Sequence, residues 1–272
     1  MKRRTYKLET NFIDCGGEKR LLVFVHGMSG GAWIWDNFTA FFSAAGYSCL
    51  TFSVRGHGGS EGAGAFTGVL HSFDSYVRDL ELVLSEYAGR KPVLIGHSMG
   101  GAVVQRYIEL HPEEASAAVL LASVPRYPGN PRRACRRSIA LKLLGSSNLS
   151  MTLFAVFGIR RISGLVKTSF CAHLDRDAAE NFALKMCRES LPAALRIAFG
   201  RLYGETSYSG KIPVMVAGGG LDYLFGLDEF KATAEYYGTE AVIFPEMCHE
   251  MAIAPNWREA AEAVSGFLQS LC

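Results

Sequence analysis

The chain of 272 residues is 49% hydrophobic and 20% charged, which is typical of a globular protein and excludes a disordered or fibrous chain. Its 28 Lys and Arg residues almost balance 26 Asp and Glu residues, and this net charge of +2 argues against bulk nucleic-acid binding. The length fits one large domain or two small ones, and it suffices to bury a core without disulfides or metal ions.

The cysteines and the start of the chain bear on where the protein works. Seven cysteines are scattered without a CxxC pair, which suits a reducing compartment better than a disulfide framework. Residues 1–14 begin with basic side chains, but the apolar run of a signal peptide does not follow. No uninterrupted apolar stretch reaches the roughly 18 residues of a spanning helix. We therefore expect a cytoplasmic protein.

In chain order, short apolar runs rich in β-branched residues alternate with segments of helical periodicity. Most of the runs are continuous, as expected of parallel strands that helices cover on both faces. The sequence therefore predicts an α/β fold with a mostly parallel, twisted sheet and helices on both faces. An alternating stretch at residues 5–13 predicts an antiparallel edge hairpin. The expected strands are residues 21–25, 48–52, 92–95, 118–121, 213–216 and 241–244, and the expected helices are residues 33–45, 73–87, 99–110, 228–237 and 257–271.

Residues 126–209 interrupt this alternation. No segment in this range predicts a strand, and three prolines at positions 125, 128 and 131 mark its entry. Such an insertion is far longer than an ordinary connection between two strands. We interpret it as a helical cap, with the core formed by residues 1–125 and 210–272. The segments with helical character are residues 132–142, 151–166, 175–188 and 191–203.

The most specific motif is GHSMGG at residues 96–101, between an expected strand and an expected helix. Glycines two positions before and after a serine fit a tight strand-to-helix turn, because side chains there would clash with the backbone of the turn. The turn lifts the serine hydroxyl out of the sheet, and the helix N-terminus brings backbone N–H groups beside it. Ser98 is therefore the predicted nucleophile.

A serine hydroxyl needs a base to attack at neutral pH, and the base needs an acid that orients it. His249 follows the last expected strand through a short loop and is the predicted base. Asp222 follows the strand at residues 213–216 through a glycine-rich loop at the same sheet edge, and it is the predicted acid. Asp228 is the rival, and we interpret it as the cap of the helix that starts there.

Two further glycine-rich turns follow expected strands. In the turn HGMSGG at residues 26–31 a backbone N–H, together with the Met99 N–H, is predicted to form an oxyanion hole, while His26 braces the loop. The turn RGHGGS at residues 55–60 matches neither phosphate-binding motif, so we interpret it as scaffold in which His57 has a structural role. No metal-ligand spacing such as HExxH occurs, and we expect neither a metal nor a cofactor.

Over nearly its whole length the chain resembles the α/β-hydrolase superfamily, in the branch of small esterases and lysophospholipase-like hydrolases. The chain order Ser98, Asp222, His249 is the order in that superfamily. The resemblance implies that these three residues form the catalytic triad, that the Met28 and Met99 amides form the oxyanion hole, and that residues 126–209 form the cap. The matching pieces are His26-Gly27, residues 55–60 and 96–100, Asp222, and residues 248–251 and 255–257.

Two departures from the resemblance concern loops around the site. Three glycines precede Leu221 and Asp222, and residues 52–55 lack the aspartate that many relatives carry before their glycine turn. Dehalogenases and epoxide hydrolases of the superfamily use an aspartate nucleophile, which Ser98 disfavours.

The expected cap is basic and apolar, with no Asp or Glu between residues 115 and 174. One interpretation is a cap with an apolar underside for an acyl chain and a basic exterior that contacts an anionic membrane surface or an anionic group of the substrate. The alternative is a solvated positive face without that role. The basic residues are Arg126, Arg132, Arg133, Arg136, Arg137, Lys142, Arg160, Arg161 and Lys167.

Taken together, these residues predict a serine hydrolase that cleaves carboxylic esters of small molecules, with an apolar acyl group, through an acyl-enzyme. A thioesterase, an amidase or a carbon–carbon bond hydrolase would use the same three residues. A hydrolase-like small-molecule receptor without catalysis is the alternative from another class.

Overall fold

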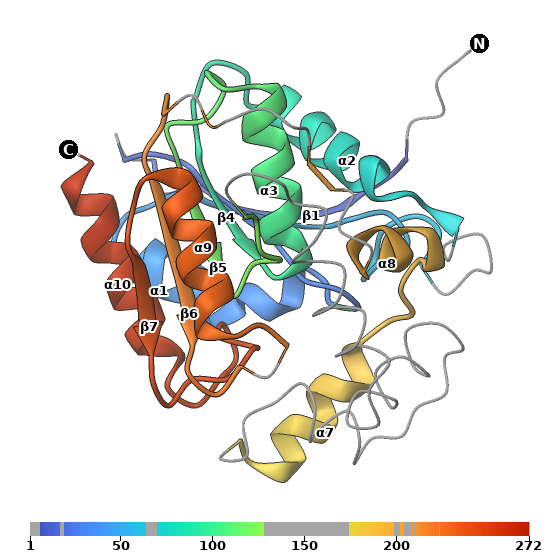
Figure 1. The fold of residues 1–272 in the computed structure, drawn as a ribbon. Helices are drawn as coiled ribbons and strands as arrows, with labels where there is room; N and C mark the ends of the chain where they lie inside the picture. The colour runs from blue at the N-terminus through green and yellow to red at the C-terminus, as the bar shows by residue number, and fades with distance from the viewer. Residues whose placement is uncertain are drawn as a thin grey trace.

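The computed structural model describes residues 6–16, 19–63, 70–127, 174–198, 202–203, 208, 210–222 and 224–271. Within them, the strands form one sheet of seven in the order β1-β3-β2-β4-β5-β6-β7 (Figure 1). β1 pairs antiparallel with β3, and all other neighbours are parallel. The strands are β1 (Glu9–Ile13), β2 (Leu22–Val25), β3 (Cys49–Ser53), β4 (Val93–His97), β5 (Ala117–Leu121), β6 (Val214–Gly219) and β7 (Ala241–Phe244).

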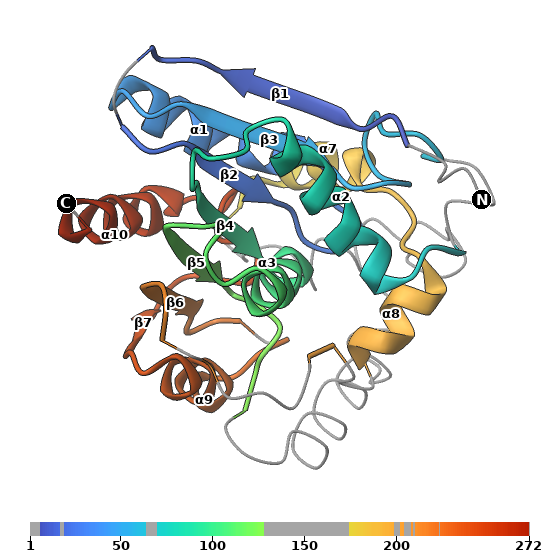
Figure 2. The same ribbon diagram turned by 90° about the horizontal axis from the view of Figure 1, so that it is seen from above.

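Helices cover both faces of this sheet. Figures 1 and 2 show α3 and α9 on one face and α1 and α10 on the other, and α2 packs beside α3. The helices are η1 (Ala32–Trp35), α1 (Asp36–Ala44), α2 (Phe73–Ser85), α3 (Met99–Leu110), α7 (Arg176–Lys185), α8 (Leu191–Ala198), α9 (Leu227–Tyr237) and α10 (Trp257–Ser270). The three-layer α/β architecture predicted from the alternation of elements is confirmed.

The predicted strands and core helices are present, and α3 begins at Met99 and ends at Leu110 as expected. The edge hairpin is wrong in its pairing. β1 is an antiparallel edge strand, but its partner is β3 and not β2, the next strand along the chain. Alternation in a sequence indicates a strand with one covered face, and it does not say which neighbour the strand pairs with.

The core lies on both sides of the central strands. β2, β3, β4 and β5 are buried along their whole length, which explains why their sequences are continuous apolar runs. Large aromatic side chains fill the α1 side, where Phe24, Trp35, Phe38 and Phe42 have no exposed surface. Burying each such side chain contributes about 1.5–3 kcal/mol to the stability of the sheet whose strand ends carry the site.

The segment between β5 and β6 leaves the sheet, as the interruption in the sequence predicts. It contains α7, which lies apart from the sheet in Figure 1, and α8, which contacts α2. Phe182 of α7 stacks on Trp33 with ring centres 5.7 Å apart, so α7 packs against η1. The expected helices at residues 132–142 and 151–166 lie outside the described residues, and the division into core and cap stays a proposal.

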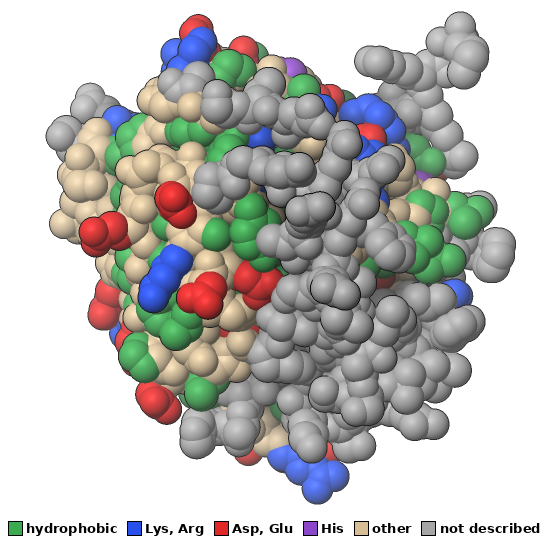
Figure 3. Space-filling view, viewed as in Figure 1, with side chains coloured by type: hydrophobic (Ala, Val, Ile, Leu, Met, Phe, Trp, Pro, Cys, Tyr) green, Lys and Arg blue, Asp and Glu red, His purple; other side chains and the backbone are tan. Residues whose placement is uncertain are grey.

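The surface shows no dominant charge on the described part of the face seen in Figure 3, where acidic and basic side chains are interspersed with others. Of the basic residues expected on the cap exterior, Arg126 is described, and it is only 4% exposed. Its guanidinium pairs with Glu109 at 3.1 Å and lies over the Tyr203 and Tyr236 rings. Arg126 is therefore a structural residue and was wrongly assigned to a basic exterior. The other basic residues of that set lie outside the described residues.

None of the described helices has the length and apolar character that crossing a bilayer requires. The cysteines differ in part from the expected reduced state. Cys15, Cys49 and Cys187 are free thiols, whereas Cys248 is disulfide-bonded.

Candidate active site

Four loops meet at the carboxyl edge of the sheet. They follow β2, β4, β6 and β7, which are parallel and therefore end on the same side. These loops carry the residues that the sequence singled out, namely Met28, Ser98 with Met99, Asp222 and His249. The fold thus brings together side chains that are far apart along the chain.

Ser98 occupies the sharp turn between β4 and α3. Its backbone has φ of 52° and ψ of −116°, a conformation that residues other than glycine rarely adopt, so the surrounding structure must hold it. The flanking glycines are required by contact with neighbouring backbone. A Cβ on Gly96 would lie 2.5 Å from the Gly100 carbonyl oxygen, and a Cβ on Gly100 would lie 2.1 Å from that of Val25. The clash predicted from the motif is confirmed.

The side chains of Ser98, His249 and Asp222 form a continuous hydrogen-bonded chain. The Ser98 Oγ lies 2.9 Å from the His249 Nε2, and the His249 Nδ1 lies 2.8 Å from the Asp222 Oδ2. The other Asp222 oxygen accepts hydrogen bonds from the Leu224 and Phe225 N–H groups at 2.9 and 3.0 Å. A carboxylate oxygen beside Nδ1 favours the tautomer with its hydrogen on Nδ1, which leaves a lone pair on Nε2 facing the Ser98 hydroxyl.

The electrostatics of His249 favour a base that becomes a stable cation. Burial acts to lower the pKa of His249, but the Asp222 carboxylate, through its charge and hydrogen bond, and the charge of Glu250 outweigh it and raise the pKa above 6.5. His249 is 3% exposed, so these interactions act with little screening by water.

His26 braces the loop after β2, as expected. The His26 ring joins two turns, because Nδ1 lies 2.8 Å from the Gly27 carbonyl oxygen and Nε2 accepts the Val54 N–H at 3.0 Å. Burial, followed by the charge of His57, lowers the pKa of His26 to about 3, so the ring is neutral. Met28 lies on this loop and Met99 is the first residue of α3, which places both backbones at the edge where Ser98 stands.

The Glu189 carboxylate, which the sequence did not single out, also holds the loop after β2. Glu189, on the segment between α7 and α8, is 1% exposed and accepts the Ser29 N–H at 3.1 Å. The Cys187 N–H donates to the Ser29 carbonyl oxygen at 2.9 Å. The segment that carries Cys187 and Glu189 therefore forms hydrogen bonds with both the N–H and the carbonyl group of Ser29, the residue next to Met28. In the sequence, Glu189 stands between Arg188 and Ser190 and has the pattern of a solvated turn.

The turn at residues 55–60 is scaffold, as predicted, and Asp79 of α2 holds it. Asp79 accepts the Arg55 backbone N–H at 2.8 Å and binds the Arg55 guanidinium with both oxygens. His57 lies 3.1 Å from Glu189 through Nε2 and 3.2 Å from the Arg55 carbonyl oxygen through Nδ1. Both histidine nitrogens thus have structural partners.

The glycines before Asp222 have a packing reason. A Cβ on Gly219 would lie 2.1 Å from the Met247 carbonyl oxygen, and one on Gly220 would lie 2.4 Å from that of Pro245. The run lets the ends of β6 and β7 approach closely, which brings Asp222 to His249. Asp228 is exposed in the first turn of α9, and the N-cap is Gly226. The interpretation of Asp228 as the helix cap was therefore wrong.

One cluster in the described residues has the composition of a metal site. One ligand atom each of His97, His249 and Glu250 lies within 4.8 Å of the others. Both ring nitrogens of His249 already have partners in Asp222 and Ser98, and the remaining two side chains give too few ligands for a structural zinc site. The cluster therefore does not point to a resident metal ion.

The strand order, the sharp turn with Ser98 after β4, and the aspartate and histidine on the loops after β6 and β7 define an α/β-hydrolase fold. Residues 16–253 match the family described as serine aminopeptidase, S33, and the chain belongs to this family. The resemblance seen in the sequence is confirmed.

Relatives and solved structures agree with this assignment. A non-heme chloroperoxidase from Streptomyces lividans is 38% identical over 105 residues, which are 38% of this chain and 37% of that protein. A probable esterase from Oryza sativa subsp. indica is 34% identical over 112 residues, 41% of each chain. The chain thus spans about two fifths of the length of these curated relatives. A thermophilic esterase structure from Thermogutta terrifontis (malate bound) has a TM-score of 0.72 at 16% identity, covering 98% of this chain and 94% of the other, and this likeness shows the fold.

Proposed function

We propose that the protein is a serine hydrolase that cleaves carboxylic esters of small molecules through an acyl-enzyme. The observation that carries the proposal is the chain of contacts from Ser98 to His249 at 2.9 Å and from His249 to Asp222 at 2.8 Å. A hydroxyl on a strained turn, a base within hydrogen-bond distance and a buried acid behind the base are the parts that acyl transfer needs. The esterase named among the relatives supports the same chemistry.

The reaction follows from the roles of these groups. His249 Nε2 takes the Ser98 proton as Oγ attacks the ester carbonyl, and Asp222 stabilises the resulting imidazolium. The Met28 and Met99 N–H groups hold the oxyanion, and loss of one such donor costs about 3–4 kcal/mol of transition-state stabilisation. The alcohol leaves with the proton from His249. Water, activated by His249, then releases the acid and restores Ser98. No cofactor takes part in this scheme.

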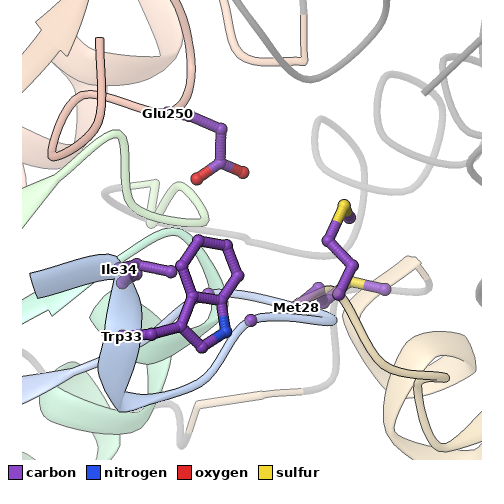
Figure 4. A pocket seen from close by; sticks show the side chains of 7 residues that line it. Met28, Trp33, Ile34 and Glu250 are labelled. Atoms are coloured by element: carbon purple, nitrogen blue, oxygen red, sulfur yellow. The ribbon is translucent and has the colours of Figure 1, made fainter. Parts of the chain in front are cut away.

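An acyl group with apolar surface fits the walls beside the nucleophile. A small hollow there is lined by Met28, Trp33, Ile34 and Met186 together with Gly27, Gly30 and Glu250 (Figure 4). Apolar side chains that surround a few polar groups are typical of small-molecule sites.

The proposal is tested by hydrolysis of p-nitrophenyl acetate and butyrate. Ser98→Ala is expected to lower kcat at least about a thousandfold, because the nucleophile is lost. Ser85→Ala, which changes an exposed serine on α2, is the matched control and should match wild type. Turnover by Ser98→Ala close to that of wild type would overturn the proposal.

Amide hydrolysis is the second candidate, favoured by the description of the family as a serine aminopeptidase. A thioesterase would differ only in the leaving group, whereas a carbon–carbon bond hydrolase needs extra polar groups around the cleaved bond. A panel of esters, thioesters and aminoacyl anilides at equal concentration ranks these reactions by kcat/KM. We expect esters to rank first, and a higher kcat/KM for anilides would replace the ester proposal by the amidase one.

Location and membrane contact also stay proposals. We propose a cytoplasmic protein. The disulfide at Cys248 is the observation against this location, because disulfides are rare in a reducing compartment.

We propose that the basic residues of the cap contact anionic lipid. The quadruple alanine variant of Arg132, Arg133, Arg136 and Arg137 should then lose binding to anionic vesicles at low salt. Equal binding by the variant and wild type would reject that contact.

A further inference from the structure

The hollow beside Ser98 contains one acidic side chain among apolar ones. A Cβ placed on Gly27, which lines the hollow, would lie 3.1 Å from the Ser98 Cβ and 2.7 Å from the His97 Nδ1. The hollow therefore opens directly beside the nucleophile. Figure 4 shows the Glu250 carboxylate pointing toward it from one side and the Trp33 ring standing on the other.

Among the described residues, no cationic side chain balances the charge of the Glu250 carboxylate. Its side chain is 18% exposed, and its Oε2 lies 3.8 Å from the His97 Nδ1. Among the residues that the structure describes, Glu250 forms an ion pair with no Lys or Arg. A carboxylate removed from water gains stability when a cation or hydrogen-bond donor reaches it.

His97 presents a second acceptor to the same place. Its Nε2 lies 2.9 Å from the His249 carbonyl oxygen, which can only accept, so Nε2 carries the ring hydrogen. Burial, followed by the charge of His249, lowers the pKa of His97 to about 3, so the ring is neutral and Nδ1 holds a lone pair. This buried Nδ1 has no hydrogen-bond partner within the described part of the chain.

Two acceptors thus face each other across 3.8 Å, and no side chain in the described ranges donates a hydrogen bond to the His97 Nδ1. The hollow has room for about one water-sized group. A primary ammonium group has this size, carries three N–H donors and a positive charge, and can donate to a carboxylate and a ring nitrogen at once.

We propose that Glu250, with His97 behind it, binds a primary ammonium group that the substrate carries on its acyl part, close to the ester carbonyl. The apolar side chains of Met28, Trp33 and Ile34 contact the carbon atoms between the ammonium and the carbonyl. Glu250 is then the residue that selects aminoacyl esters over neutral esters of the same shape. This inference rests on the proposed ester hydrolysis at Ser98.

The test uses two esters of nearly equal shape, methyl 3-aminopropanoate and methyl butanoate, which differ by an ammonium in place of a methyl group. Release of acid is followed at pH 8, where the amine is protonated. Burial raises the pKa of Glu250 to about 7, so the carboxylate is ionised at this pH. EDTA is present, because a divalent cation between His97, His249 and Glu250 would compete. Wild type should prefer the ammonium ester at least about tenfold in kcat/KM.

Glu250→Gln should reduce this preference to about one. The ratio of the two kcat/KM values separates recognition from general damage, because a change at His249 slows both esters alike. Glu246→Gln removes the same charge from an exposed position of the same loop and should keep the wild-type ratio. Equal kcat/KM for the two esters in wild type, or an unchanged ratio in Glu250→Gln, would overturn the inference alone. Turnover of neither ester by wild type would overturn the proposed function, and the inference with it.

Discussion

The carboxylate of Glu189 lies 3.1 Å from the ring Nε2 of His57, and both side chains are buried. The same carboxylate accepts hydrogen bonds from the Tyr76 hydroxyl at 2.7 Å and from the Ser29 N–H at 3.1 Å. A single side chain of the inserted segment therefore joins α2, the turn after β3 and the loop that carries Met28. The geometry of the loop that carries Met28 depends on contacts between distant parts of the chain.

Removing this carboxylate should destabilise the protein. Glu189→Ala leaves His57, Tyr76 and Ser29 without their buried partner, and we expect the free energy of unfolding to fall by about 3–5 kcal/mol. Urea denaturation followed by circular dichroism measures this loss. Glu180→Ala is the control, since Glu180 pairs with Arg176 on an exposed face and its removal should cost at most about 0.5 kcal/mol. Equal losses in the two variants would show that the buried network does not stabilise the fold.

The stabilisation by this pair should depend on pH in a defined window. Burial acts to raise the pKa of Glu189, but the charge and hydrogen bond of His57 and the bonds from Tyr76 and Ser190 lower it from 4.5 to about 2. Its contribution is therefore present above pH 4.5 and is lost as the pH falls toward 2. Burial acts to lower the pKa of His57, but Glu189 raises it above 6.5, so that contribution is present below pH 6.5 and is lost at higher pH.

The difference in unfolding free energy between wild type and Glu189→Gln should accordingly be largest between about pH 4.5 and 6.5. Urea midpoints at pH 3, 5.5 and 9 measure it. A difference that stays constant across these three values would mean that the two side chains do not interact as an ion pair.

Much of the architecture can be predicted from the sequence because the signals are local. Continuous apolar runs indicate buried strands, and the glycines around Ser98 fix the start of α3 at Met99. The partner of β1 could not be predicted, because pairing with β3 depends on the order of the strands in space. Similarly, the role of Glu189 depends on contacts with residues more than a hundred positions away, such as Tyr76.

The identity of the acid can be tested by two matched substitutions. Asp222→Asn removes the negative charge that orients His249 and stabilises its cation, and kcat for ester hydrolysis should fall by about 10³–10⁴. Asp228→Asn changes an exposed carboxylate a few residues along the chain and should leave kcat within about twofold. A large loss in Asp228→Asn with none in Asp222→Asn would show that Asp228 is the acid and would contradict the assignment of Asp222.

A pair of glycine substitutions should have opposite effects on stability. In Gly100→Ala the new Cβ would lie 2.1 Å from the Val25 carbonyl oxygen, so β2 and α3 must move apart, and we expect a loss of at least about 2 kcal/mol. Gly266, in the middle of α10, has open space around it, and Gly266→Ala should stabilise by about 0.5–1 kcal/mol. Thermal unfolding measures both, and a destabilised Gly266→Ala or an unchanged Gly100→Ala would contradict the packing described here.

The residues of the candidate site that lie in motifs after strands could be predicted from the sequence, whereas Glu250, a single acidic side chain outside any motif, could not. Ser98, Asp222 and His249 stand in recognisable positions after strands, and they meet within hydrogen-bond distance. Glu250 follows His249 directly, but the sequence shows only that a second histidine for metal binding is missing. Its place beside the hollow follows from the fold of the loops after β2 and β7.

The most direct test of the central claim is covalent labelling by a fluorophosphonate, followed by intact mass and peptide mapping. A serine activated by His249 should form one adduct, located on Ser98, and labelling should be absent in Ser98→Ala and slowed at least about a thousandfold in His249→Gln. This result would also exclude a non-catalytic receptor. A folded wild-type protein that takes up no label, or that takes it up on another residue, would contradict the account.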